Sequence, residues 1–232
     1  MRDNGQIAVF GDSILKEVVL DTDNDRYYIP KDSITKNMSE TFSLNIQNNS
    51  RFGCTITKGF DQMQRALARG LTCDVVVLGF GGNDCDHNWA QVAEDPKASH
   101  KAATPIDVFE KIYREMIQKL KENNIIPIII SLPPIDGEKY FDWITRTDLD
   151  KNNIMEFIGD KQALARLQEL YSNTAVKIAH DTNTFLVDVR SKFLDKTNFK
   201  DLICADGIHP TPLGHKLIMQ AFYEFAKTHL YE

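Results

Sequence analysis

The sequence predicts an α/β fold, namely a three-layer α/β/α sandwich around a five-stranded, mostly parallel sheet. Apolar runs of strand length recur along the 232 residues, and most are continuous rather than alternating, as expected for strands covered on both faces. Segments with helical periodicity lie between and after these runs, which favours right-handed crossovers in an open, doubly wound sheet. The length fits one such domain, so we expect a single domain over residues 1–232.

Five apolar runs are predicted to form the strands of this sheet. In chain order they are Ile7–Phe10, Phe42–Ile46, Val75–Phe80, Ile125–Ile130 and Phe185–Val189.

Three segments space their apolar residues along one helical face, and these run from Val108 to Leu120, from Leu164 to Ile178 and from Leu213 to Phe225. Thr211 is expected to cap the last of these helices, with Pro212 in its first turn. The sequence contains no internal repeat and no linker that would separate two domains.

Two connections are longer than a minimal crossover requires. Residues 84–105 follow the third predicted strand, and residues 133–160 follow the fourth. Both leave the carboxyl ends of their strands, where open α/β sheets bind ligands, so we expect them to form a lid or a pocket wall. Their aromatic residues are the candidates for substrate selection, with packing of the loops as the alternative; they are Trp89, Tyr140, Phe141 and Trp143.

The composition excludes several classes of function. The net charge is −6 and no stretch concentrates Lys and Arg, which argues against a nucleic-acid partner. No apolar run approaches the roughly 20 residues that a membrane helix needs. The polar start shows no secretory signal, and the four cysteines lack zinc spacing, so we expect free thiols in a cytoplasmic protein.

A serine, a histidine and an aspartate form the strongest chemical signal. Ser13 follows the first predicted strand, where a turn can lift its side chain out of the sheet. Serine attacks poorly unless a base takes its proton, and that base needs a partner to fix its tautomer. Asp206 and His209 are three positions apart, so the carboxylate can reach one ring nitrogen while the other faces Ser13. This pattern predicts a serine hydrolase.

Three motifs resemble those of the SGNH hydrolases, also called GDSL-type esterases and lipases. They are Gly11-Asp12-Ser13-Ile14, Gly81-Gly82-Asn83-Asp84 and Asp206-Gly207-Ile208-His209, in the family's order and at family-like places. The resemblance spans almost the whole chain and implies a flavodoxin-like sandwich with a Ser13, His209 and Asp206 triad. A glycine after the second strand, a fourth feature of the family, is best matched by Gly53.

The resemblance also implies an oxyanion hole and a substrate class. Its donors would be the backbone N–H groups of Ser13 and Gly53 and the side-chain amide of Asn83. The implied substrate is a small-molecule ester with a short acyl group, such as an acetylated carbohydrate. Lysophospholipid or thioester substrates and acyl transfer remain open, and the chemistry needs neither a cofactor nor a metal.

Other interpretations of the same residues stay open beside this one. Ser13 can be a helix cap, and Asp12 a brace for its loop without a catalytic role. The polar run Asp84–His87 lacks metal-ligand spacing and is expected to be a loop. His215 is a rival base that we interpret as structural. The rival functions are a catalytically silent binding domain and a nucleotide-binding protein, and the incomplete glycine pattern of Gly79–Gly82 disfavours the second.

Overall fold

Five parallel strands form the central sheet of the computed structural model, which describes residues 5–229. In spatial order they are β4 (Asn45–Asn48), β1 (Gln6–Gly11), β5 (Val75–Gly79), β6 (Ile126–Ile130) and β7 (Phe185–Val187). All neighbouring pairs are parallel, with β1 between β4 and β5. This arrangement confirms the predicted fold class. The two central strands β1 and β5 are almost entirely buried, which explains their continuous apolar sequences.

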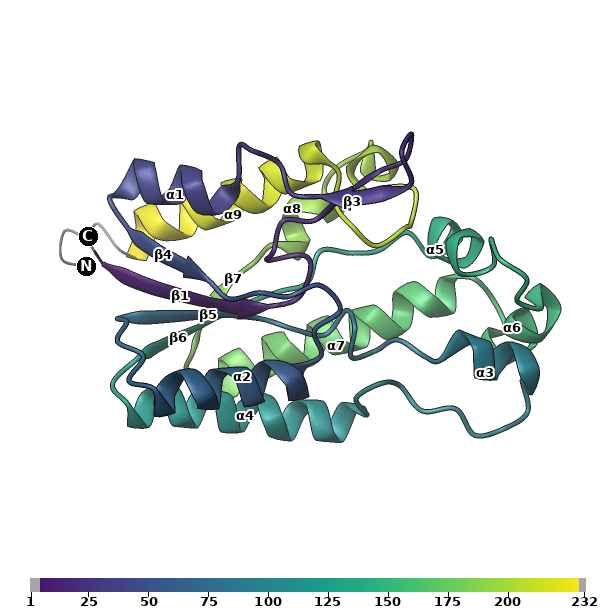
Figure 1. Ribbon diagram of the computed structural model, residues 1–232, viewed down its shortest axis with the longest axis horizontal. Coiled ribbons are helices and arrows are strands. Elements are labelled where there is room, and N and C mark those ends of the chain that lie inside the picture. The colour runs from purple at the N-terminus through teal and green to yellow at the C-terminus, as the bar shows by residue number, and fades with distance from the viewer. Residues whose placement is uncertain (1–4, 230–232) are drawn as a thin grey trace.

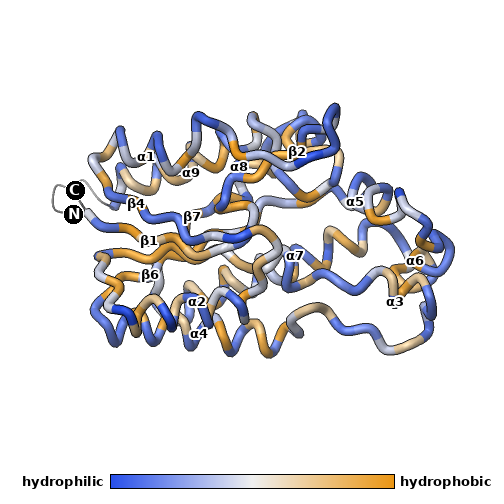
Figure 2. The backbone as a smooth tube through the Cα atoms, viewed as in Figure 1, coloured by the Kyte–Doolittle hydropathy of each residue, from blue (hydrophilic) through white to orange (hydrophobic). Residues whose placement is uncertain are grey.

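Helices cover both faces of the sheet (Figure 1). On one face lie α1 (Ile34–Phe42), α8 (Arg190–Leu194) and α9 (Pro212–His229), with a 3-10 turn at Phe199–Leu202. On the other face lie α2 (Ile56–Ala68), α4 (Ile106–Glu122) and α7 (Gln162–Asp181). Each layer packs its own apolar cluster against the sheet. In Figure 2 the inner strands, such as β1 and β6, are accordingly mostly apolar, whereas polar and apolar residues alternate along the helices.

Three short helices stand apart from these layers, at the right of Figure 1. They are α3 (Trp89–Glu94), α5 (Gly137–Ile144) and α6 (Lys151–Ile158). They belong to the two long connections and share a third apolar cluster, which we call the lid cluster, built around Val92, Phe141, Ile154 and Leu164. The long connections are therefore ordered walls rather than loose loops.

A two-stranded hairpin that the sequence analysis did not predict follows β1. It consists of β2 (Val19–Asp21) and β3 (Arg26–Tyr28), which pair antiparallel and form a sheet of their own. The purple hairpin lies over the carboxyl end of the main sheet in Figure 1, beside the yellow-green segment that precedes α9.

The second predicted strand was wrong in position. Phe42 is the last residue of α1, and Ser43 then adopts a left-handed conformation with φ of 51°. The strand itself, Asn45–Asn48, is a polar edge strand. The predicted apolar run, Phe42–Ile46, therefore overlaps the end of the preceding helix and only the start of the strand. The last strand is also shorter than predicted, ending at Val187. The helices α1 and α2, between the first three strands of the sheet, were not predicted.

The three predicted helices are present as α4, α7 and α9. Thr211 caps α9 as expected, since its Oγ1 accepts a hydrogen bond of 3.2 Å from the backbone N–H of Gly214. Three residues assigned to apolar faces are instead exposed, namely Val108, Leu170 and Leu213.

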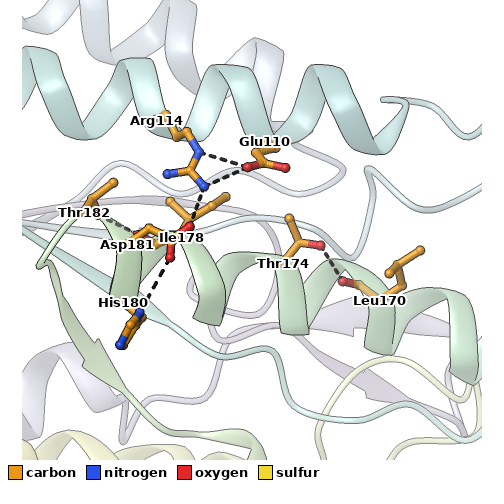
Figure 3. Close-up of polar contacts among 8 residues, drawn as sticks. All are labelled: Glu110, Arg114, Leu170, Thr174, Ile178, His180, Asp181 and Thr182. Carbon is orange, nitrogen blue, oxygen red and sulfur yellow. Dashed lines mark hydrogen bonds and ion pairs between the residues drawn. The ribbon is translucent and has the colours of Figure 1, made fainter.

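An ion pair ties α4 to α7 on the outer surface. Arg114 of α4 lies 2.7 Å from Glu110 on its own helix and 2.8 Å from Asp181 at the end of α7 (Figure 3). The side chains are partly exposed, so this pair contributes little beside the apolar contacts below it.

Candidate active site

Three strand ends and one loop meet at a single edge of the sheet. Ser13 follows β1, Gly53 follows β4 and Asn83 follows β5. After β1 the chain forms β4 on one side of β1, and it then crosses over to form β5 on the other side. The carboxyl end of β1 is therefore a topological switch point, where open α/β sheets bind ligands. His209 joins them from the segment between the 3-10 turn and α9.

Ser13, His209 and Asp206 form one hydrogen-bonded line. The hydroxyl of Ser13 lies 2.8 Å from Nε2 of His209, and Nδ1 of the same ring lies 2.6 Å from Oδ2 of Asp206. All three side chains are buried, with Asp206 fully so. With Nδ1–H donating to the carboxylate, Nε2 is left as an acceptor for the hydroxyl proton of Ser13.

A tight turn fixes the two partners of Ser13. Oδ1 of Asp206 accepts the backbone N–H groups of Ile208 and His209, each at 3.0 Å, and Gly207 between them has a φ of 77°. Burial opposes ionisation of Asp206, but the hydrogen bonds and the charge of His209 outweigh it and hold its pKa below the ordinary value. The carboxylate is therefore charged where it faces the imidazole.

Asn83 and Asp12 lie beside the serine. The amide of Asn83 is 3.3 Å from Oδ2 of Asp12 and 3.4 Å from the carbonyl of Cys54, both long contacts. Oδ1 of Asp12 accepts the backbone N–H of Ile14 at 2.9 Å, so Asp12 braces the loop. Burial raises the pKa of Asp12 to about 7. Its carboxyl thus orients the amide without contacting Ser13.

Two backbone donors at this edge are free. Within residues 5–229, neither the N–H of Ser13 nor that of Gly53 forms a hydrogen bond to another protein group. Gly53 has a φ of 65°, and a Cβ built there would meet nothing within 4 Å. Glycine is thus explained by the left-handed backbone rather than by lack of space.

A cavity of about 360 Å³ opens next to Ser13. Trp89, Tyr140 and Trp143 line it, so three of the four predicted aromatic residues lie at the site. Phe141 does not line the cavity; it is buried in the lid cluster.

Asp86 fixes part of this wall. It accepts hydrogen bonds from Nε1 of Trp89 at 2.8 Å and from the hydroxyl of Tyr140 at 2.6 Å. Burial raises the pKa of Asp86. One carboxyl group thereby connects α3 to α5 across the cavity.

Two further aromatic rings lie against His209. Tyr27 of β3 is 5.0 Å from the imidazole, measured between ring centroids, and Phe52 is 5.6 Å from it, nearly parallel at 14°. Both line the cavity. No motif marks them in the sequence, and sequence reasoning missed them.

Comparison with known proteins agrees with this geometry. Residues 9–217 match the model of the GDSL-like lipase/acylhydrolase family. The chain belongs to this family. The resemblance read from the motifs is confirmed, and this GDSL-like protein is an enzyme of the hydrolase class.

Solved structures resemble the GDSL-like chain along its whole length. The lipase/acylhydrolase from Enterococcus faecalis is 18% identical with a TM-score of 0.64, covering 97% of this chain and 96% of that one. An acetylxylan esterase from Geobacillus stearothermophilus, solved as a catalytic mutant, is 18% identical with a TM-score of 0.66, covering 97% and 95%. The acetyl xylan esterase AlAXEase is 24% identical with a TM-score of 0.62, covering 94% and 98%. No curated protein sequence matches the chain.

Other titratable groups of this GDSL-like hydrolase have structural partners. Nε2 of His215 lies 3.1 Å from the carbonyl oxygen of Val18, and burial lowers the pKa of His215 to about 4, so the ring is a neutral donor. Asp84 accepts the backbone N–H of Ile56 at 2.8 Å.

Across residues 5–229, no three His, Cys, Asp or Glu side chains are grouped to hold a metal ion. The four cysteines are free thiols. The same residues include no helix that is long and apolar enough to cross a membrane.

Proposed function

We propose that this protein is a serine esterase that works through an acyl-enzyme. The observation that carries the proposal is the buried line from Ser13 through His209 to Asp206, with distances of 2.8 and 2.6 Å, at the edge of a cavity. A serine helix cap needs no such base, and His215, the rival, faces a backbone carbonyl instead.

The reaction follows from these contacts. Nε2 of His209 takes the proton of Ser13 as its Oγ attacks the ester carbonyl, and the imidazolium that forms is stabilised by Asp206. The same ring then gives the proton to the departing alcohol, which leaves an ester between the acyl group and Ser13. Water, activated by His209, hydrolyses that ester and restores the serine.

Charge on the carbonyl oxygen would be met by three donors. They are the backbone N–H groups of Ser13 and Gly53, which have no partner within residues 5–229, and the amide of Asn83, whose present contacts are long. An oxyanion donor of this kind contributes about 10²–10³ in rate where one has been removed. The amide is neutral, so it does not compete with His209 for the proton.

The substrate we propose is a small ester with a short acyl group, with acetylated carbohydrates as the first class to test. Two similar structures are acetylxylan esterases, which supports that choice. The volume of the cavity, about 360 Å³, and its aliphatic lining, which includes Leu132, Ile135 and Leu164, favour a second candidate. That candidate is a longer acyl chain, as in a lysophospholipid or a thioester.

Labelling and a panel of esters test the proposal together. A fluorophosphonate probe should modify the wild type, and Ser13→Ala should abolish both labelling and hydrolysis of p-nitrophenyl acetate without lowering the melting temperature. Ser50→Ala is the matched control, because Ser50 is buried at the same end of the sheet and its hydroxyl has no hydrogen-bond partner within residues 5–229; this variant should be labelled like the wild type. Undiminished turnover by Ser13→Ala would place the nucleophile elsewhere.

The panel then separates the two substrate candidates. p-Nitrophenyl acetate should be hydrolysed faster than p-nitrophenyl octanoate if the site serves short acyl groups, and the reverse order would favour the longer chain.

A further inference from the structure

Three aromatic rings form a triangle at the mouth of the cavity. The centroid of Tyr27 is 5.0 Å from that of Phe52, and the two rings lie 5.0 and 5.6 Å from His209. We call Tyr27 and Phe52 the mouth pair. They come from separate segments, the hairpin strand β3 and the connection between β4 and α2.

The mouth pair is exposed where the histidine is not. Phe52 is 53% exposed and Tyr27 is 38% exposed, whereas His209 is 2% exposed. The two rings thus cover the imidazole and still present apolar surface to the cavity that they line. Packing in the protein core explains why Tyr27 and Phe52 contact His209. It does not explain why both rings keep a large part of their surface exposed.

The chemistry of the proposed reaction decides which part of an ester reaches that surface. When the tetrahedral intermediate collapses, Nε2 of His209 must donate its proton to the oxygen of the leaving alcohol, so this oxygen lies within hydrogen-bond reach of Nε2. The acyl carbon is at that moment bonded to Oγ of Ser13. The rings that touch His209 therefore flank the alcohol rather than the acyl group.

We propose that Tyr27 and Phe52 form the leaving-group subsite of the enzyme, and that it selects alcohols with a flat apolar face. Aromatic rings bind such faces by stacking, and a sugar ring or an aryl group offers one, whereas a short alkyl alcohol does not. This inference rests on the proposed esterase function. It adds that the alcohol part of the ester binds against Tyr27 and Phe52. The other cavity-lining tryptophans, Trp89 and Trp143, would then contact the acyl group or the far end of the alcohol.

Three esters separate selection of the alcohol from selection of the acyl group. The ratio of kcat/KM for benzyl acetate to that for ethyl acetate reports on the alcohol. The ratio for ethyl butyrate to ethyl acetate reports on the acyl group. Benzyl and ethyl alcohols are both primary alcohols, so the first ratio measures binding of the ring more than the ease of departure. Each stacking ring should contribute about 3- to 10-fold to it.

Phe52→Leu and Tyr27→Leu should each lower the benzyl-to-ethyl ratio by about 3- to 10-fold and leave the butyrate-to-acetate ratio unchanged. Phe52→Tyr keeps an aromatic ring and should therefore have the benzyl-to-ethyl ratio of the wild type. Tyr28→Leu is the matched control, since Tyr28 is the next residue of β3, is similarly exposed at 40% and does not line the cavity. It should change neither ratio.

An unchanged benzyl-to-ethyl ratio in both leucine variants, or a shift in the butyrate-to-acetate ratio instead, overturns the subsite. Phe52 is more than half exposed in a connecting segment, so Phe52→Leu tests the inference even where Tyr27→Leu unfolds the hairpin. If the wild type hydrolyses none of the three esters and its Ser13 is not labelled by a fluorophosphonate, the esterase function itself fails.

Discussion

Two buried histidines show how environment decides the role of a residue. His209 faces a carboxylate with one nitrogen and a hydroxyl with the other, so it can accept and return a proton. His215 donates to the carbonyl of Val18, and its other nitrogen has no partner within the described residues. Burial lowers the pKa of His215 to about 4, so that ring stays neutral and cannot store a proton near neutral pH. The residue type alone does not distinguish the two.

Tyr27 also interacts with the charged partner of His209. Burial, together with the negative charge and hydrogen bonding of Asp206, raises the pKa of Tyr27 well above its ordinary value, so its hydroxyl stays protonated. Tyr27→Phe removes that hydroxyl and keeps the ring. We expect kcat to fall about 3- to 10-fold with little change in KM, since a polar group close to the carboxylate of Asp206 is lost.

Nuclear magnetic resonance tests the cause of that loss. The proton between His209 and Asp206 should give a far-downfield signal in the wild type that moves in Tyr27→Phe. Tyr28→Phe removes a neighbouring hydroxyl outside the cavity and should leave both kcat and the signal as they are. A fall in kcat without movement of the signal would contradict a positioning role for the hydroxyl.

The residues proposed to carry out the chemistry can be predicted from the sequence, but the residues that pack against them cannot. Ser13, Asn83 and His209 stand in short motifs, because each needs a fixed local turn that a few adjacent residues encode. Tyr27 and Phe52 reach His209 only through packing between distant segments, and such contacts leave no local spacing to detect. Their roles, like those of the proposed triad, remain predictions to be tested by substitution.

At the scale of elements, the wall of the cavity contains aromatic residues that line the cavity and others that are buried behind its surface. Trp89 and Trp143 line the cavity, whereas Phe141 is buried among α3, α5 and α6. We expect Trp89→Ala and Trp143→Ala to change the ratio of kcat/KM between acetyl and octanoyl esters, because each enlarges the pocket.

Phe141→Ala is the control for that experiment. It should lower stability by about 3–5 kcal/mol, seen as a lower melting temperature, while the ratio stays at the wild-type value. If the two tryptophan variants behave like Phe141→Ala, the aromatics only pack the wall and do not select substrate.

The turn that carries Asp206 and His209 depends on a glycine with no room for a side chain. Gly207 has a φ of 77°, and a Cβ there would lie 2.3 Å from the backbone nitrogen of Tyr140. Gly207→Ala should therefore move the turn away from α5 and reduce kcat by more than 10²-fold, on the order of losing a well-placed catalytic base.

Gly70 provides the comparison, because its φ is 82° and its Cβ would meet nothing within 4 Å. Gly70→Ala should cost about 1–2 kcal/mol in the free energy of unfolding from backbone strain alone, with activity retained. Steady-state kinetics and urea unfolding of the two variants measure the difference. Equal effects on kcat would show that the clash with α5 does not matter.

Element boundaries were predictable where burial sets the pattern and not elsewhere. The strands β1, β5 and β6 have continuous apolar sequences and were found close to their true limits. The edge strand β4 is polar because one side of it has no neighbouring strand, so periodicity missed it. The hairpin β2–β3 has strands of three residues each. Val19 and Leu20 of β2 are buried, but β3 is exposed throughout, so the apolar run is too short to predict a strand.

At the scale of the whole molecule, buried ionisable groups make stability depend on pH in opposite directions. Burial raises the pKa of Asp12 to about 7 from an ordinary value of 3.8. Its contribution to stability is therefore complete below about pH 4 and is lost as the pH rises through 7. His215 has the opposite effect, since its lowered pKa gives a contribution that is present above pH 6.5 and is lost as the pH falls towards 4.

Asp12→Asn removes the first of these effects. Between pH 5 and pH 7 the free energy of unfolding should fall by about 2 kcal/mol less in the variant than in the wild type, because the folded state no longer has a proton to lose. Urea unfolding at pH 5, 6 and 7 measures the slope. Asp23→Asn, at an exposed position, should keep the wild-type slope, and equal slopes in all three proteins would contradict a raised pKa at Asp12.

The fold class and family of the molecule were predictable because three motifs and a strand pattern agree along most of the chain. The single-domain organisation, the cytoplasmic location and the absence of nucleic-acid partners stay predictions. The last two concern the surroundings of the chain, which the packing inside it does not reveal.

The contact between Ser13 and His209 joins residues that are 196 positions apart. Helices such as α4 and α7 can form from local contacts, but this contact exists only after β1 has entered the sheet and the segment before α9 has docked on it. Contacts of such long range form late, because the chain between them must be ordered first. If Ser13 is the nucleophile, as proposed, its reactivity reports completed folding, and a partly folded chain with most of its helices would not react with a fluorophosphonate.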